Sequence, residues 1–468
     1  MVTAIMMVLA LPMMGLMFDS TILFIIKSRL QGAVDGAALA GARGLARGSN
    51  SSQQITSAQA AATSYVRLNY PNNSFFSGAV TIPSPTVDLS VAFQRTVTVT
   101  ANVPFPGLIL QYMAGPTTVR ASAAVTRKDV NVAMVLDRSG SLSASGSCAP
   151  MKAAAASFVD QFAPGRDNIG LVTFAFTSYV NFPIANTFQT ANPNVKTLVN
   201  NITCAGSTST AMGLWLGYQQ LVGLNQPGAL NVILLFTDGE PTAAAFNMPV
   251  ANGSPCTAYT AGNPTGPGGY TRPATAKGYM RGLMNTYSNS AQFFGINDYV
   301  GTTVAGQQSI TNGDNNKPPN SNNCAYVSNA NTLTDWAGVP LVDLFGNSTN
   351  SGYQPVTLTN GMISLGNASN APAMAINAAD SAATRIRNGV IEPINGGSLA
   401  NVLILSIGLG TSAVGPASPT FLRRVSNDPL STIYDPTKPT GHYYDAPTIA
   451  DLAPAFQEVA SEILRLAR

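Results

Sequence analysis

The sequence predicts an α/β protein whose larger part has a doubly wound, mostly parallel sheet, preceded by an apolar N-terminal helix and a small α+β module. Three changes of pattern predict this: an apolar run, then alternating residues, then buried strands that alternate with helices. We place the boundaries at residues 1–26, 27–128 and 129–468. The chain has 468 residues, and single cores rarely exceed about 250–300 residues, so more than one folded part is expected.

The N-terminal run, residues 1–26, is apolar except for Thr3 and Asp19-Ser20-Thr21. A helix of about 20 apolar residues spans a bilayer, so we expect a single membrane helix here. A cleaved signal peptide is the alternative, but it has an apolar core of about 7–15 residues after a basic start, and that start is missing. A buried core helix is the other alternative, although soluble helices usually show a polar face.

The low content of charged residues limits the kinds of partner that are expected. Charged residues make up 10% of the chain and the net charge is +3, with no basic run. Nucleic acid is therefore not an expected partner. Asn, Ser and Thr supply most of the polar surface, which is typical of an exported protein. Lys27 and Arg29 follow the apolar run, however, and the positive-inside rule alone would place the C-terminal part in the cytoplasm.

The module at residues 27–128 begins as a continuation of the apolar helix. Small residues recur there every four positions: Gly32, Gly36, Ala40 and Gly44. Such a face lets two helix backbones approach closely. Alternatively, the small side chains on this face reflect only the high alanine content of the helix. Residues 53–69 continue in a helical pattern. Residues 80–126 alternate apolar and polar side chains and are rich in Val and Thr, which predicts a half-exposed antiparallel sheet.

The C-terminal part contains continuous apolar runs of strand length at 130–136, 168–176, 231–236 and 401–407, with helical segments at 151–163 and 210–223 between them. Strands buried on both faces that alternate with helices predict a parallel sheet. Residues 243–370 interrupt the pattern with Asn, Gly, Ser, Thr and Pro. We treat this stretch as an insertion with only short helical pieces, near residues 275–287.

The loop Asp137-Arg138-Ser139-Gly140-Ser141 follows the first of these strands. Ligands gather at the carboxyl ends of strands in doubly wound folds. Alternate positions of an extended loop point the same way, so one carboxylate and two hydroxyls can converge. Mg²⁺ prefers such oxygen ligands. Taken alone the loop is also compatible with an ordinary turn or helix cap.

Two further segments extend this set. The segment 204-CAGSTSTAMGL-214 supplies Thr208 just before a predicted helix, and 235-LFTDGEP-241 supplies Asp238 just after a buried strand. With the DRSGS loop they resemble the von Willebrand factor type A family and its metal-ion-dependent adhesion site. The resemblance implies the metal-binding set Asp137, Ser139, Ser141, Thr208 and Asp238.

In that family the hydroxyls bind Mg²⁺, Mn²⁺ or Ca²⁺ directly and the two aspartates act mainly through water. An acidic residue of a protein ligand completes the shell, so the resemblance implies binding rather than catalysis. It also implies a C-terminal helix that packs on the sheet, and here its apolar stripe consists of Leu452, Phe456, Val459, Ile463 and Leu466.

The first 65 residues have a resemblance of their own. The stretch DSTILFIIKSRLQGAVDGAALAGA is similar to TadG-like proteins of tight-adherence (Flp) pilus loci, with Leu30-Gln31, Asp35 and residues 37–42 matching and Gly36 departing. That resemblance implies a bacterial envelope protein that spans the inner (cytoplasmic) membrane once. Its C-terminal domain would be periplasmic or extracellular, with pilus or surface components as partners.

The four cysteines allow three pairings. In the type A fold Cys148 and Cys204 both belong to loops around the metal, and Cys256 and Cys324 both fall in the insertion. We therefore expect the pairs Cys148–Cys204 and Cys256–Cys324. Disulfides persist in oxidising compartments, which argues that the domain faces outward and outweighs the positive-inside signal.

Enzyme functions are not expected. His442 is the only histidine, and we find neither a nucleophile elbow nor a set of zinc ligands. Residues 408–413 fit G-x-G-x-x-A, but Pro416 and Pro419 follow, so no helix begins there to hold a pyrophosphate, and no small-molecule substrate is expected. Two functions remain: a metal-dependent adhesion module, or a structural component of pilus assembly whose metal site only stabilises the fold.

Overall fold

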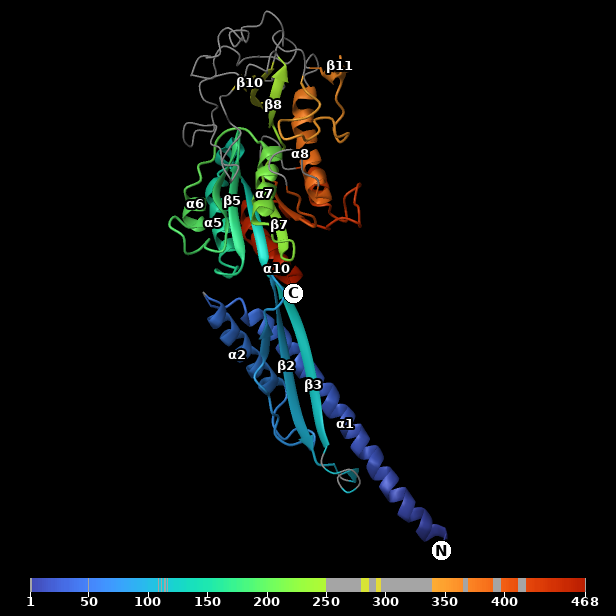
Figure 1. The fold of residues 1–468 in the computed structure, drawn as a ribbon. Helices are drawn as coiled ribbons and strands as arrows, with labels where there is room; N and C mark the ends of the chain where they lie inside the picture. Colours follow the sequence, from blue (N-terminus) through green and yellow to red (C-terminus); the bar gives the residue numbers. More distant parts are fainter. Residues whose placement is uncertain are drawn as a thin grey trace, which may run out of the picture. The chain divides into compact units, whose positions relative to one another are not determined.

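The computed structural model describes residues 2–48, 50–107, 109–110, 112, 115, 117–249, 279–285, 292–295, 339–364, 369–389, 397–410 and 418–467. The chain divides into two compact units (Figure 1). The first comprises Met1–Asp129 with the short segments Phe162–Arg166 and Arg465–Arg468, and the second comprises Val130–Gln161 and Asp167–Leu464. Each unit has its own hydrophobic core and is described by itself.

Two helices form one layer of the first unit, α1 (Val2–Gly44) and α2 (Ser51–Asn69). Asn50 caps α2, because its side chain accepts a hydrogen bond of 3.0 Å from the backbone N–H of Gln53. The helical patterns predicted for the residues after 26 and for 53–69 are therefore confirmed.

Small residues bring these two helices together. A Cβ atom on Gly44 would lie 2.7 Å from the Cα of Ala58, and one on Gly36 would lie 2.4 Å from the ring of Tyr65. Ala40 is half-buried, whereas Gly32 is exposed with nothing within 4 Å of its Cβ position. The face predicted from the spacing of small residues thus packs at Gly36 and Gly44 on α2 of the same unit.

The other layer is an antiparallel sheet of β1 (Thr86–Asp88), β2 (Gln94–Phe105) and β3 (Thr117–Lys128). Along β2 every second side chain from Val97 to Phe105 is buried, as the alternating sequence predicts. The predicted sheet is confirmed, except that residues 89–93 and residues 82–85 are not strand. Pro83 and Pro85 lie in the latter stretch and cannot donate to a ladder.

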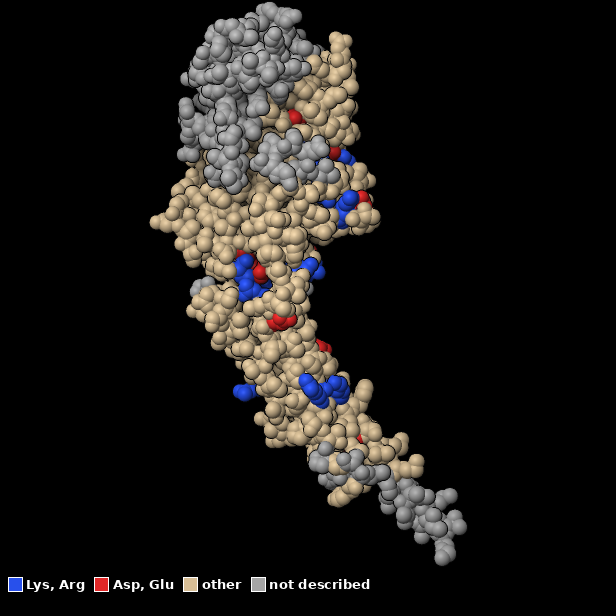
Figure 2. All heavy atoms as spheres, viewed as in Figure 1, with Lys and Arg blue, Asp and Glu red and all other residues tan. Residues whose placement is uncertain are grey.

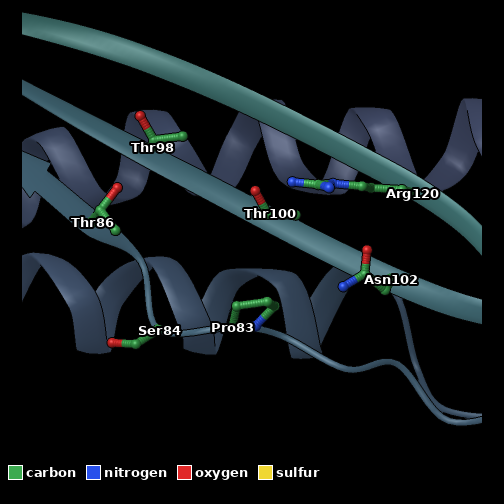
Figure 3. Close-up of a pocket in the computed structure, with 7 residues that line it drawn as sticks. All are labelled: Pro83, Ser84, Thr86, Thr98, Thr100, Asn102 and Arg120. Carbon is green, nitrogen blue, oxygen red and sulfur yellow. The ribbon is translucent and has the colours of Figure 1, made fainter.

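The outer face of this sheet is polar. It carries a hollow of about 280 Å³ (Figure 3), lined by Pro83, Ser84, Thr86, Thr98, Thr100, Asn102 and Arg120. Figure 3 shows the side chains of β2 on the side away from the helices, with Arg120 reaching toward Thr100 from β3. The hydroxyl-rich face therefore faces solvent, while the Val-rich face covers α1 and α2.

The membrane helix expected at residues 1–26 is not supported. These residues do form the first part of α1, but no helix among the described residues is long and apolar enough to cross a membrane. The side chains of residues 1–12 lie outside the described set. Within the expected span, Ile26 belongs to the core of the first unit, and buried Asp19 accepts hydrogen bonds of 2.8 Å from the N–H groups of Ile109 and Leu110.

The second unit is built on one six-stranded sheet. In spatial order its strands are β14 (Tyr443–Ala446), β13 (Leu403–Leu409), β7 (Leu230–Thr237), β4 (Val130–Asp137), β5 (Asn168–Phe174) and β6 (Ser178–Ala185). All neighbours pair in parallel except β5 and β6. The predicted doubly wound, mostly parallel sheet is confirmed, and its order reverses between β4 and β7, where such folds bind ligands.

Helices cover both faces of this sheet. On one face α7 (Thr210–Leu224), α8 (Asn370–Asn388) and α9 (Pro419–Ser426) share an apolar cluster with the strands. The shorter helices are α4 (Gly140–Ala144), α5 (Cys148–Val159), α6 (Val195–Asn200) and the 3₁₀ turn η5 (Ile449–Asp451). Figure 1 shows α5 and α6 on the side of the sheet away from α8.

The last helix, α10 (Leu452–Leu466), packs through the predicted apolar stripe. Phe456 lies 5.8 Å from Phe236 of β7 and 6.1 Å from Phe158 of α5, measured between ring centroids. Leu452, Val459 and Ile463 are buried as predicted. Leu466, however, is 40% exposed at the end of the helix, so its assignment to the stripe was wrong.

The described residues of the insertion form more strands than the sequence predicts. It begins with β8 (Ala243–Pro249), which pairs with β9 (Tyr279–Asn285), and β9 pairs with β10 (Gln292–Gly295). The helical piece expected near 275–287 is therefore wrong for β9. A short apolar run is ambiguous between helix and strand, and here a partner on each side satisfies the strand backbone. A two-stranded hairpin, β11 (Leu358–Thr359) and β12 (Met362–Ile363), lies in residues 339–364, the return segment of the insertion.

Charged side chains are sparse and scattered on the molecular face in Figure 2, where residues other than Lys, Arg, Asp and Glu dominate. This agrees with the 10% charged residues of the chain. No continuous basic area is drawn on that face among the described residues.

Candidate metal centre

The two aspartates predicted from the strand ends lie at one edge of the sheet. Asp137 is the last residue of β4, and Asp238 directly follows β7. The two strands are adjacent and parallel, with Leu136 paired to Phe236. Both carboxylates are completely buried, at 0% exposure. The parallel register therefore brings together two acids that are far apart in the sequence.

The DRSGS loop turns back over this edge. Asp137 accepts a hydrogen bond of 2.7 Å from the backbone N–H of Ser139, which holds the loop against its own first residue. The hydroxyls of Ser139 and Ser141 lie 2.9 Å apart. Ser141 donates a hydrogen bond of 2.7 Å to Asp238 Oδ1, and Ser139 lies 3.4 Å from the same oxygen. Four of the five predicted ligands thus form one hydrogen-bonded cluster.

Thr208, the fifth predicted ligand, lies on a loop that is joined to the first by backbone hydrogen bonds. The N–H of Gly140 donates to the carbonyl of Gly206 at 2.8 Å, and the N–H of Ala205 donates to the carbonyl of Arg138 at 2.8 Å. Thr208 is buried, at 5% exposure. Within the described part of the chain, no hydrogen bond joins its side chain to the other four ligands.

A disulfide also connects these two loops. Cys148, the first residue of α5, is bonded to Cys204, with their Cα atoms 6.1 Å apart. This pairing is confirmed. Cys256 and Cys324 lie outside the described residues, so the second pairing stays a prediction.

The electrostatics of the cluster favour a bound cation. Burial and, to a lesser extent, the nearby charge of Asp238 together raise the pKa of Asp137 to about 7, against the hydrogen bonds from Thr237 and Ser139. Burial likewise raises the pKa of Asp238. Two buried carboxylates side by side are costly in the charged form, and a divalent cation between them removes that cost.

One carboxylate oxygen of the cluster has no hydrogen-bond donor in the part of the chain that the structure describes. Asp238 Oδ2 is buried and has no hydrogen-bond partner among the described residues. Buried carboxylate oxygens are normally hydrogen-bonded or metal-bound. Three neutral hydroxyls and two carboxylates form an oxygen-only set, which suits Mg²⁺. The residues present therefore fit the ion that the type A resemblance implies.

No competing metal site is found in the part of the chain that the structure describes, since no group of three or more His, Cys, Asp or Glu side chains could hold an ion there. The candidate centre differs from such clusters because hydroxyls supply most of its ligands.

Two supporting residues were not singled out from the sequence. Thr237 donates a hydrogen bond of 2.5 Å to Asp137 Oδ2 and so fixes the second oxygen of that carboxylate. The parallel register places Thr237 beside Asp137, and this could have been found by aligning the two buried strands. Buried Arg138 lies between two ligands in sequence, with its guanidinium carbon 4.5 Å from the ring centroid of Tyr179. No sequence signal distinguished it.

Comparison with known proteins agrees with this geometry. The family model for the von Willebrand factor type A domain matches residues 131–254, a range that contains all five predicted ligands. A von Willebrand factor type A domain is present in this chain. The strands β13 and β14 lie beyond the matched range but complete the sheet of this type A domain. No curated protein matches the sequence.

Several solved structures match this chain at low similarity. A von Willebrand factor type A protein from Catenulispora acidiphila is 12% identical, with 79% of this chain and 46% of that chain covered and a TM-score of 0.34. The PilB minor pilin from Streptococcus sanguinis is 12% identical, with 84% and 79% covered and a TM-score of 0.35.

The vWF domain of the type V pili tip protein Mfa5 from Porphyromonas gingivalis is 16% identical, with 73% and 97% covered and a TM-score of 0.39. This chain spans less than half of the Catenulispora protein, 46% of its length. The TadG-like resemblance of the first 65 residues is not confirmed by these comparisons and stays a prediction.

Proposed function

We propose that this chain is a protein-binding adhesion module whose type A domain requires a divalent cation, Mg²⁺ or alternatively Mn²⁺ or Ca²⁺. The observation that carries the proposal is the buried, unpartnered Oδ2 of Asp238 beside the Ser139–Ser141 hydroxyl pair. These side chains, with Thr208 and Asp137, would hold the ion.

Each residue has a separate part in that binding. Ser139 and Ser141 offer neutral oxygens, which leave the ion most of its positive charge. Asp137 is oriented by the N–H of Ser139 and the hydroxyl of Thr237. The bound cation supplies an electrophilic position that an acidic side chain of a partner protein can occupy.

A binding role fits the surroundings of the site better than a catalytic one. His442 precedes β14 and therefore lies at the amino end of the strands, whereas Asp137 lies at a carboxyl end. The imidazole Nδ1 lies 3.8 Å from Asp428 Oδ2. We therefore propose that the chain is not an enzyme and takes no small-molecule substrate.

The direct test is calorimetric titration of Mg²⁺ into the wild-type chain, beside Asp137→Ala and the control Asp160→Ala. Asp160 is an exposed carboxylate of the same domain and pairs with Lys196 at 2.8 Å. We expect saturable binding to wild type and to the control, and none to Asp137→Ala. Retained binding by Asp137→Ala would remove the basis of the proposal.

Partner binding is tested on immobilised host-matrix and bacterial surface proteins. We expect retention of the wild-type chain that is lost with chelator, restored by Mg²⁺ and absent for Asp137→Ala. Retention that is insensitive to chelator would show that the ion does not mediate contact.

The proposal includes an outward location, with the first unit attached to the inner membrane of a bacterial envelope. The Cys148–Cys204 disulfide supports an oxidising compartment. Attachment is supported by apolar side chains of α1 that are exposed in the first unit, including Met17 at 71% and Phe24 at 75%. Protease treatment of intact and permeabilised cells, followed by membrane fractionation, tests both parts.

The second candidate function is a structural role in pilus assembly, with a metal that only stabilises the fold. The same uncovered side chains of α1, Met13, Met14, Phe18 and Phe24, favour it, because they suit packing on an apolar helix of another subunit. Cells that carry Asp137→Ala separate the two functions. Loss of adhesion with intact pili supports the adhesion module, whereas loss of pili supports the assembly role.

A further inference from the structure

The insertion is hydrogen-bonded directly to a predicted metal ligand. Thr208 donates its backbone N–H to the hydroxyl oxygen of Thr242 at 2.9 Å. Its carbonyl accepts hydrogen bonds from the N–H of Thr242 at 2.9 Å and from the N–H of Ala243 at 3.1 Å. Thr242 immediately precedes β8, the first strand of the insertion. Both backbone groups of Thr208 are thus held by the start of the insertion.

This contact is separate from the restraints at the beginning of the loop. Gly206, two residues before Thr208, is bonded to Gly140 of the DRSGS loop, and Cys204 is bonded to Cys148. Those contacts fix the beginning of the threonine loop. Without the hydroxyl of Thr242, the N–H of Thr208 would keep no hydrogen bond among the described residues, while its carbonyl would still accept from the N–H groups of Thr242 and Ala243.

The start of the insertion is a firm support for such a contact. The side chains from Ala243 to Phe246 are buried, with exposures of 0% to 1%. The N–H of Leu344, in the return segment, donates to the carbonyl of Ala245 at 2.8 Å, so the two ends of the insertion are joined. Thr242 therefore precedes a segment that burial and hydrogen bonding hold in place.

We propose that Thr242 is a positioning residue for the metal centre: its hydroxyl orients Thr208 toward the ion, so that the insertion helps to set the cation affinity. This inference rests on the proposed function, because it requires that Thr208 bind the ion. By linkage, a bound ion in turn stabilises the pairing of Thr208 with β8.

The test compares Mg²⁺ affinities of four full-length variants by calorimetric titration. Thr242→Val and Thr242→Ala remove the hydroxyl, and Thr242→Ser keeps it. Thr349→Val is the matched control, since buried Thr349 makes one side-chain hydrogen bond, of 2.7 Å, to the carbonyl of Pro340 in the return segment. We expect about a fivefold loss of affinity in the first two, the effect of one hydrogen bond, and wild-type affinity in the other two.

Amide hydrogen exchange distinguishes positioning of Thr208 by Thr242 from a role of Thr242 in fold stability alone. In wild type, Mg²⁺ should slow exchange at Thr208, Thr242 and Ala243, and in Thr242→Val this slowing should be lost while Gly140 keeps it. Wild-type Mg²⁺ affinity in both hydroxyl-free variants overturns this inference and leaves the proposed function standing. Absence of Mg²⁺ binding by the wild-type chain overturns both.

Discussion

Ser141 donates a 2.7 Å hydrogen bond to Asp238 Oδ1, while the second oxygen of the same carboxylate is buried without a partner among the described residues. One half of the carboxylate is therefore satisfied by the protein and the other half is available to an ion. This asymmetry leads to a prediction in which stability and metal affinity change in opposite directions.

Asp238→Asn should stabilise the metal-free protein and abolish its response to Mg²⁺. The variant removes a buried charge that repels Asp137, and we expect the free energy of unfolding without metal to rise by about 1 kcal/mol. Thermal unfolding with and without Mg²⁺ measures both effects. Wild type should gain stability from the ion and the variant should not. A variant that is less stable than wild type without metal contradicts this account of the pair.

Mg²⁺ affinity should fall as the pH is lowered from about 8 to about 6, because binding requires deprotonated carboxylates. Burial raises the pKa of Asp137 from its ordinary value of 3.8 to about 7. The loss should approach about tenfold per pH unit below the raised pKa. Calorimetric titration across this range measures it, and the control Asp160→Ala should show the same pH dependence as wild type. A pH-independent affinity in wild type contradicts the assignment.

The metal-free protein should show the opposite pH dependence. A pKa that is raised by folding contributes stability that is complete below the unfolded value of 3.8 and is lost as the pH rises through about 7. The contribution of Asp137 should therefore increase the free energy of unfolding of the metal-free chain as the pH falls from about 8 to about 5. Chemical denaturation in the presence of chelator checks the sign, and Asp137→Asn should flatten the curve.

The clustering of the two aspartates and the two serines was predictable because each part has a local signature. Asp137 ends a run of buried apolar residues, and Asp238 follows another, so parallel pairing alone places them at one edge. The supporting roles of Thr237 and Thr242 were not predictable in the same way. They depend on register and contacts between segments that are distant in the sequence, and an isolated threonine carries no signal of its partner.

Two other differences have physical reasons of the same kind. The spacing of Gly36 and Gly44 identified a face for close packing but not the helix that occupies it, which is α2. The short apolar run at Tyr279–Asn285 is compatible with either helix or strand, and pairing with β8 and β10 decided the outcome. In both cases the outcome depends on a tertiary contact, and the partner in that contact cannot be read from a single sequence.

Reduction of the Cys148–Cys204 disulfide should lower both stability and metal affinity. The bond closes a loop with a sequence separation of 56 residues, and its removal typically costs about 2–4 kcal/mol. Affinity should fall because the bond ties the Thr208 loop to the helix that follows the DRSGS loop. Denaturation and Mg²⁺ titration with and without reductant measure the two effects. A chain with Cys148 and Cys204 changed to serine should show the same loss of Mg²⁺ affinity without any reductant.

Two glycines of α1 should respond in opposite ways to the same substitution. In Gly44→Ala the new Cβ would lie 2.7 Å from the Cα of Ala58 and 2.8 Å from the carbonyl of Ser57, so the two helices must separate. We expect a cost of about 1–3 kcal/mol from this overpacking. Gly32→Ala meets nothing within 4 Å and should stabilise the helix by about 0.5–1 kcal/mol, because alanine is the better helix former. Hydrogen exchange of the α2 amides in the full chain should rise in the first variant and stay unchanged or fall in the second. Equal effects of the two substitutions would show that α1 and α2 are not in close contact at Gly44.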